Sequence, residues 1–160
     1  MNNVNPQIDV RLVEYQANKL QELINEMNNC CQERIYLEAK MFGLPPSELK
    51  CLALFDGHRY LTAMTVAGKL EVAKSRATVI IDNLVRKGLL QRAPDPNDAR
   101  VKLVSLTPKG QRKVREIEEF VFHLHSQLLG QIEASQRPNI ISALEVLRSA
   151  MESIKAQLQV

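Results

Sequence analysis

Apolar residues recur every three or four positions over three long stretches of the chain, and this spacing predicts amphipathic helices. The first stretch spans residues 10–42 and is ended by GLPP at 43–46. Thr107 followed by Pro108 begins the second, because a threonine cap and a first-turn proline favour a helix start. SQRP at 135–138 separates the second stretch from the third, which continues toward the C-terminus. The apolar positions are, in chain order, Val13, Ala17, Leu20, Ile24, Met27 and Cys31; Val114, Ile117, Val121, Leu124 and Leu128; Leu144, Leu147, Met151, Ile154 and Leu158.

Shorter apolar runs between the long helices predict a compact unit. Pro94 and Pro96 exclude a helix around PDPNDAR, so we expect the two short strands that flank it to form a hairpin. In the first short helix we expect Leu49, Leu52 and either Leu54 or Phe55 to be buried. In chain order the expected elements are a helix over 47–55 with Ser47 as its candidate cap, a turn at 56–58, a helix over 61–70 capped by Thr62, a helix over 74–88 ended by Gly88, and strands over 89–93 and 101–106.

A helix, a tight turn, a second helix and a hairpin with a basic tip are the pattern of a winged helix-turn-helix. The predicted fold class is therefore mainly α with a small β-hairpin wing. The second helix of such a unit enters the DNA major groove, where arginine and asparagine pair with base edges. We expect it to bury Ala77, Ile80, Ile81, Leu84 and Val85, and to present Ser75, Val79, Asp82, Asn83 and Arg86, with Lys74 and Arg76 at its N-terminal end. Free amides there suit a phosphate.

Charge is distributed unevenly along the 160 residues, whose net charge is only +3. Between Gly57 and Lys113 there are twelve Lys or Arg against four Asp or Glu, whereas the rest has nine against fourteen. A basic middle between acidic flanks indicates that the middle meets a polyanion.

The turn of the hairpin carries Arg100 beside two acidic residues, Asp95 and Asp98. We expect one of the aspartates to pair with Arg100 or to cap turn amides, which would hold the arginine extended. An extended arginine suits the minor groove, and Arg92 and Lys102 on the adjoining strands would contact phosphates. The alternative is a loop ion pair, which would contribute only about 0–1 kcal/mol.

Residues 61–110 resemble the DNA-binding lobe of MarR-family transcription regulators. The motifs that carry the resemblance are Leu61-Thr62, NLVRKGLL at 83–90, DPNDAR at 95–100 and VSLTPKG at 104–110. The resemblance implies a homodimer that binds a pseudo-palindromic operator, usually as a repressor. It implies an N-terminal dimerisation helix over 1–45, the winged lobe over 46–106 and C-terminal dimerisation helices over 107–160.

By the same resemblance, Arg100 is the minor-groove arginine, Asp98 supports it, and Ser75, Arg76 and Val79 occupy contact positions on the recognition helix. This sequence departs from the family pattern at three places. Ala73 stands where a capping Ser or Thr is common, Ala99 where a second basic residue is frequent, and Val79 where a polar contact residue is common.

The signals for a regulatory ligand are weaker. Many family members respond to small aromatic effectors, and His58, Arg59 and Tyr60 are candidate ligand contacts because they precede the lobe.

We expect Cys30, Cys31 and Cys51 to be inert packing residues. His123 and His125 lie on different sides of one helix, so no metal site and no cofactor is expected. We find no nucleotide loop, catalytic triad or zinc signature and expect no enzyme.

Two other functions fit the pattern less well: a winged helix that binds an acidic protein partner, and a DNA-coating protein without sequence preference. The apolar stripes of the terminal helices favour a homodimer over an intramolecular bundle. The sequence has no signal-peptide pattern and no apolar run of membrane-spanning length, which predicts a place in the prokaryotic cytoplasm, with the nucleoid.

Overall fold

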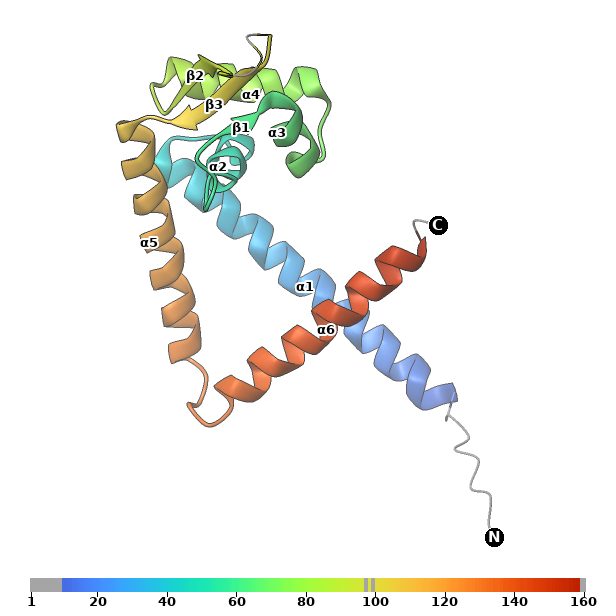
Figure 1. Ribbon diagram of the computed structural model, residues 1–160. Helices are drawn as coiled ribbons and strands as arrows, with labels where there is room; N and C mark the ends of the chain where they lie inside the picture. Colours follow the sequence, from blue (N-terminus) through green and yellow to red (C-terminus); the bar gives the residue numbers. More distant parts are fainter. Residues whose placement is uncertain (1–9, 97, 99, 159–160) are drawn as a thin grey trace. The chain divides into compact units, whose positions relative to one another are not determined.

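The computed structural model describes residues 10–96, 98 and 100–158. The first nine residues of the expected N-terminal dimerisation segment, and Ala99 of the wing motif, lie outside this described part. The chain divides into two units, one up to Gln111 and one from Arg112 onward. The elements are α1 (Val10–Phe42), α2 (Pro46–Ala53), β1 (Leu61–Thr62), α3 (Ala63–Leu70), α4 (Lys74–Arg86), β2 (Leu90–Pro94), β3 (Lys102–Leu106), α5 (Pro108–Gly130) and α6 (Arg137–Leu158) (Figure 1).

Helix α1 has the bounds that the apolar spacing predicts. It ends at Phe42. The next residue, Gly43, has a φ of +63°, in the left-handed region that glycine adopts without strain, and the Leu44 amide donates to the Ala39 carbonyl. The prediction of Ser47 as the cap of α2 is wrong. Pro46 occupies the first turn and Pro45 the N-cap position, with no side-chain cap bond. The reason is that a proline fits the first helical position, so the helix starts one residue earlier.

The core of the first unit joins α2, α3, α4 and the sheet. Its largest fully buried side chains are Leu52, Val66, Ile81, Leu84, Leu90, Val104 and Cys51. Leu49 and Phe55 are buried, whereas Leu54 is half-buried, which settles the choice left open for α2. On α4 the predicted inner face is confirmed at Ala77, Ile80, Ile81 and Leu84, and only Val85 is half-buried.

The turn between α3 and α4 is tight. The Thr62 hydroxyl accepts a hydrogen bond of 3.1 Å from the Thr65 amide, so its predicted capping role is confirmed. Glu71 closes α3 in the left-handed conformation with a φ of 54°, and α4 begins three residues later. Ala73 is the N-cap of α4 and supplies no side-chain bond, as its methyl group dictates.

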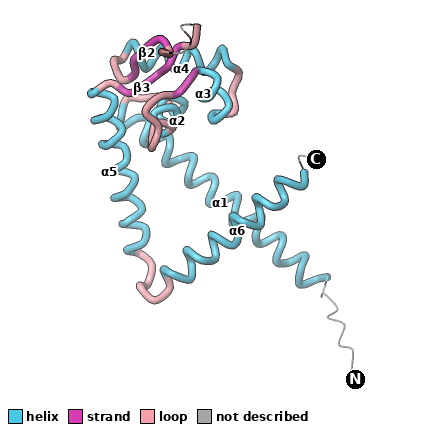
Figure 2. Tube along the Cα trace, viewed as in Figure 1, coloured by secondary structure: helices cyan, strands magenta, loops and turns pink. Residues whose placement is uncertain are grey.

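The predicted hairpin is confirmed, and it belongs to an antiparallel sheet with the strand order β1-β3-β2 (Figure 2). Leu90 lies opposite Leu106 and Arg92 opposite Val104. Strand β1 was not predicted, because its two residues were assigned to the start of the following helix. It pairs Leu61 with Val104 and Thr62 with Leu103.

The second unit contains α5 from Arg112 onward and α6, which are joined by a short turn. In that turn the Arg137 Nε donates to the Ile132 carbonyl at 3.0 Å. None of the residues of α6, all of which the structure describes, is buried. Among the described residues no helix has the length and apolar character needed to cross a membrane.

Candidate nucleic-acid interface

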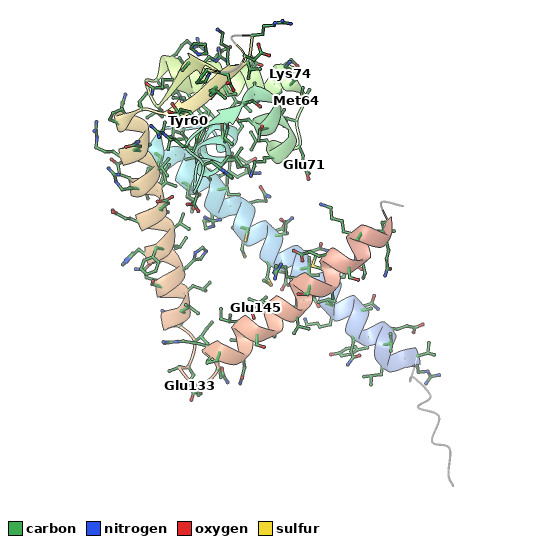
Figure 3. The ribbon with its side chains drawn as sticks, in the orientation of Figure 1. Tyr60, Met64, Glu71, Lys74, Glu133 and Glu145 are labelled. Atoms are coloured by element: carbon green, nitrogen blue, oxygen red, sulfur yellow. The ribbon has the colours of Figure 1, made fainter. Side chains whose placement is uncertain are left out.

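Helix α4 presents a basic and polar face to solvent. Lys74, Ser75 and Arg76 are exposed in its first turn, and the Val79 side chain, one turn further on, is 48% exposed. Figure 3 places Lys74 at the start of α4, after Glu71 in the turn and Met64 on α3. The first turn of α4 contains no acidic residue and no side-chain cap, so its positive dipole end is not neutralised by the chain itself. This end of the helix suits an anion.

The last turn of α4 carries Asn83 and Arg86. The Arg86 guanidinium donates a hydrogen bond to the side-chain oxygen of Asn83, three residues earlier. Arg86 is exposed and Asn83 is half-buried. The bond joins two polar side chains of the last turn, which also border Glu48 and Lys87.

The wing holds Arg100 away from the rest of the chain. Its side chain is 96% exposed, and its amide donates to the Asp98 carboxylate at 3.0 Å. The Asp98 carbonyl also accepts from the Val101 amide at 2.9 Å, and the Asp95 amide donates to the Val101 carbonyl at 3.0 Å. Asp98 therefore shapes the turn and accompanies the arginine, as the spacing of the two residues predicts. Lys102, at the start of β3, is exposed as well.

Arg92 and Asp82 form an ion pair that links the wing to α4. The Arg92 Nη1 lies 2.6 Å from the Asp82 Oδ1, and the two side chains are 35% and 46% exposed. The sequence predicts Asp82 on the open face of α4 and Arg92 near phosphate, but it does not predict a contact between the two side chains. Only the packing of β2 against α4 brings them together.

His58, Arg59 and Tyr60, the candidate ligand contacts, line one cleft of about 340 Å³. The Arg59 guanidinium carbon lies 5.2 Å from the centre of the Tyr60 ring, and the His58 Nε2 lies 3.3 Å from the Lys69 Nζ. Across the strands, the Gln91 amide donates to the Ser105 hydroxyl at 3.2 Å. The remaining lining residues are Phe55, Gln91, Ser105, Leu106 and Gln111. The cleft therefore has a cationic and hydrogen-bonding lining without a carboxylate.

The three cysteines differ in their surroundings. Cys51 is buried, and burial, followed by the nearby Glu48 carboxylate, raises the pKa of its thiol to about 12. Cys30 and Cys31 are exposed on α1, so the expected burial of these two is not found in the single chain. The reason is that the apolar side of α1 has little of this chain packed on it. His123 and His125 are exposed, and the described residues contain no cluster of three or more possible metal-ligating side chains.

Residues 42–101, which include α2, the helix-turn-helix and most of the wing, match the sequence model of the MarR family. Residues 42–101 form a MarR-family winged helix-turn-helix. Helix α4 is accordingly the second helix of the helix-turn-helix and the β2-β3 hairpin the wing. This match and the names of the curated relatives support a DNA-binding transcription regulator.

Curated relatives and solved structures agree with this assignment. The HTH-type transcriptional repressor MdtR of Bacillus subtilis is 35% identical over 75 residues, which are 47% of this chain and 48% of MdtR. YdgJ of the same organism, an uncharacterized HTH-type transcriptional regulator, is 24% identical over 71% of this chain and 70% of its own length. The chain thus spans from about half to about 70% of these relatives.

Among solved structures, apo MarR of E. coli is 26% identical with a TM-score of 0.65, over 82% of this chain and 96% of MarR. A MarR-family protein from Bacillus stearothermophilus gives a TM-score of 0.78 at 21% identity, over 87% and 97% of the two chains. A mutant of S. aureus MepR, solved with a bound oligodeoxyribonucleotide, gives 0.63 at 19% identity, over 82% and 97%. The similarity to the last two structures, at 21% and 19% identity, shows a shared fold only.

Proposed function

We propose that this protein is a homodimeric repressor of the MarR type that binds a pseudo-palindromic operator in double-stranded DNA and is released by a small effector. The observation that carries the proposal is the wing: an arginine with a 96% exposed side chain, held at the tip by an aspartate. An arginine in that position fits a narrow minor groove, where the negative potential is concentrated. The curated name of MdtR as a repressor supports the sign of regulation.

Base recognition is assigned to the open face of α4. Its N-terminal turn faces phosphate and the first base pairs, its middle offers the Val79 side chain to a thymine methyl group, and its last turn offers the Asn83-Arg86 pair. Arg100 enters the minor groove and Lys102 contacts the backbone. The residues proposed to act at DNA are Lys74, Ser75, Arg76, Val79, Asn83, Arg86, Asp98, Arg100 and Lys102.

A second copy of the chain is proposed to cover the apolar faces of α1 and α6. On α6 the exposed large apolar side chains include Leu144, Met151 and Ile154, which follow the spacing of one helix face. Contiguous apolar surface of this kind marks a partner site, and a two-fold dimer is its commonest solution. A two-fold dimer would also present two wings and two recognition helices to the two halves of a palindrome.

The effector site is proposed to be the cleft around His58, Arg59 and Tyr60. Its volume of about 340 Å³ lies at the lower end of the range for small-molecule sites. A small aromatic molecule with an acidic group would stack on Tyr60 and place its charge near Arg59. Gln91 and Ser105 belong to β2 and β3, so a molecule bound there would contact the strands of the wing.

The function is tested by measuring binding to a duplex from upstream of the protein's own gene and to a random duplex, at two salt concentrations. We expect preference for the upstream duplex, a steep salt dependence and a marked loss on Arg100→Ala. Equal binding to both duplexes would favour a non-specific DNA-coating protein. No binding at low salt would overturn the DNA function of the wing and favour a protein partner.

The effector site has a separate test. Small aromatic acids and phenols are titrated into the protein–operator complex, and release of the DNA is followed by fluorescence anisotropy. We expect release from the parent protein at concentrations that leave the complex of Arg59→Ala intact. Arg115→Ala, at an exposed position of α5 outside the cleft, is the matched control and should behave like the parent. Equal release from parent and Arg59→Ala would place the effector elsewhere.

A further inference from the structure

One acidic side chain lies in the middle of the proposed DNA-binding face. Asp82 follows Val79 by three positions and Ser75 by seven, so the three residues share one side of α4. Its side chain is 46% exposed. A free carboxylate at this place would repel the phosphates of the duplex, and each such repulsion weakens binding.

The carboxylate is neutralised by a cation that comes from the wing. The Arg92 Nη1 lies 2.6 Å from the Asp82 Oδ1. Side chains alternate along a strand, so Arg92 shares its face of the hairpin with Leu90, which is only 2% exposed and packs in the core. Gln91 lies on the opposite face, where it bonds Ser105 and lines the cleft. Arg92 therefore continues the face of β2 that packs toward α4.

The outer end of the wing is built from two strands and the turn between them. Strand β1 pairs with β3 only at Leu103 and Val104, so the hairpin continues past it toward the tip as a two-stranded ribbon. Two-stranded ribbons twist strongly and are marginally stable in water. Arg92 lies opposite Val104, where β1 also pairs with β3, so the Arg92–Asp82 pair attaches the three-stranded base of the wing to α4, just before the two-stranded end that carries Arg100.

We propose that Asp82 and Arg92 act as a strut, an ion pair that fixes the wing against the recognition helix α4. With the two elements fixed, α4 can enter the major groove while Arg100 enters the minor groove of the same site. Arg92 is then a positioning residue for DNA binding and not a phosphate contact. This inference rests on the proposed DNA-binding function. Exposed ion pairs contribute little to folding, so loss of the strut affects the affinity for DNA much more than the stability of the chain.

The test is a double-mutant cycle with Asp82→Asn, Arg92→Gln and the double variant, together with the exchange of both charges, Asp82→Arg with Arg92→Asp. Affinities for operator and random duplex are measured at several salt concentrations, and circular dichroism follows thermal unfolding. We expect each single variant to bind the operator about 5- to 20-fold more weakly, and the double variant to be little worse than either. We expect the exchange to regain most of the operator affinity.

Two measurements distinguish a strut between Asp82 and Arg92 from a direct contact of Arg92 with a DNA phosphate. Asp82→Asn removes a negative charge, so simple electrostatics predicts tighter binding, whereas the strut predicts weaker binding to the operator. Arg92→Gln should leave the salt slope unchanged, whereas loss of a phosphate contact lowers it by about 0.9. Tighter binding by Asp82→Asn, additive effects and a reduced slope would overturn the proposal.

Failure of the strut can be distinguished from failure of the proposed function. If the parent protein prefers no duplex, the function itself is wrong; if the parent prefers the operator but Asp82→Asn binds it more tightly, only the strut is wrong. Should a single variant unfold, Arg92→Lys keeps the charge but loses the flat guanidinium geometry, and an unchanged operator affinity of that folded variant would contradict the strut.

Discussion

In the wing, the Asp98 carboxylate accepts a hydrogen bond of 3.0 Å from the Arg100 amide, and the same oxygen lies 3.9 Å from the Arg100 Nε. The aspartate therefore fixes the backbone of the arginine and lies close to its side chain. The hydrogen bond to the amide is local and closes the turn. The longer contact to the Nε places a carboxylate beside the guanidinium, whose side chain is 96% exposed.

Separate substitutions of the two residues distinguish these roles. We expect Arg100→Ala to lower operator affinity by about 1–3 kcal/mol, because it removes the proposed minor-groove contact. Asp98→Asn keeps an oxygen that can accept from the amide, so its loss should be smaller than that of Asp98→Ala, which opens the turn. Fluorescence anisotropy with a labelled operator measures the affinity of all three variants.

The control for the arginine is Arg115→Ala, which removes the same charge from an exposed position of α5 outside the wing. We expect it to bind within about twofold of the parent. Equal losses for Arg100→Ala and Arg115→Ala would mean that only net charge matters and that the wing makes no special contact.

Most elements could be predicted because their signals are local. The three-and-four spacing defines the long helices, Thr62 and Thr107 cap theirs, and Gly88, with a φ of +71°, ends α4. The relation of Asp98 to Arg100 was predictable because the two residues are neighbours in one turn. Ser47 was the one wrong cap, since the choice between Pro46 and Ser47 as the helix start depends on a one-residue shift.

What could not be predicted depends on residues that are distant in sequence. Strand β1 is too short to show alternation and exists because β3 offers it an edge. The Asp82–Arg92 pair requires the wing to pack on α4. The lining of the cleft combines the loop before β1 with β2, β3 and the start of α5, so only part of it, His58 to Tyr60, could be named from the sequence.

Self-association should depend on the apolar side of α6. Met151 is 52% exposed in the single chain and lies one turn after Leu147. We expect Met151→Glu to raise the dimer dissociation constant at least about 100-fold, because burying an unpaired carboxylate in an apolar interface is costly. Sedimentation velocity at several protein concentrations measures the change.

Ser149→Glu introduces the same charge two residues earlier, away from the Leu144–Leu147–Met151 side of the helix. The parent and this control should sediment as dimers at concentrations where Met151→Glu is a monomer. A parent protein that stays monomeric, or equal effects of the two glutamates, would contradict a dimer through α6.

Cys51 should be unreactive in the folded protein. Its thiol is fully buried, and burial raises its pKa from 9.0 to about 12, so almost no thiolate exists at pH 8. In a variant with Cys30→Ser and Cys31→Ser, we expect a thiol reagent at pH 8 to modify Cys51 only after denaturant is added. Rapid modification of the folded variant would show that α2 opens readily and would contradict this burial.

The same thiol gives alkaline pH a defined effect on stability. Well below pH 9 the Cys51 thiol is protonated in both states and contributes no pH dependence. Between pH 9 and 12 the unfolded chain releases the proton while the folded chain keeps it, so rising pH favours unfolding. In the variant without Cys30 and Cys31, the free energy of unfolding should therefore fall more steeply from pH 8.5 to 10.5 than after the further change Cys51→Ala. Equal slopes would contradict the raised pKa.

Gly110 should be intolerant of any side chain, because it allows the first turn of α5 to approach Leu89, which precedes β2. A Cβ at this position would lie 2.0 Å from the Leu89 carbonyl oxygen and 3.1 Å from the Leu106 Cδ2. That carbonyl already accepts the Thr107 amide at 3.0 Å, so backbone atoms would have to move. We expect Gly110→Ala to lower the free energy of unfolding by about 1–3 kcal/mol.

The matched control is Gly68→Ala on α3, where a Cβ would meet no atom within 4 Å. In an exposed helix interior, alanine is favoured over glycine by about 0.5–1 kcal/mol, so this variant should be more stable than the parent. Chemical denaturation of the parent and both variants, followed by circular dichroism, gives the two values. Opposite signs at Gly110 and Gly68 would establish that Gly110 is required by its close contact with Leu89. A shared stabilising effect would mean that α5 can move away from Leu89 at little cost in free energy.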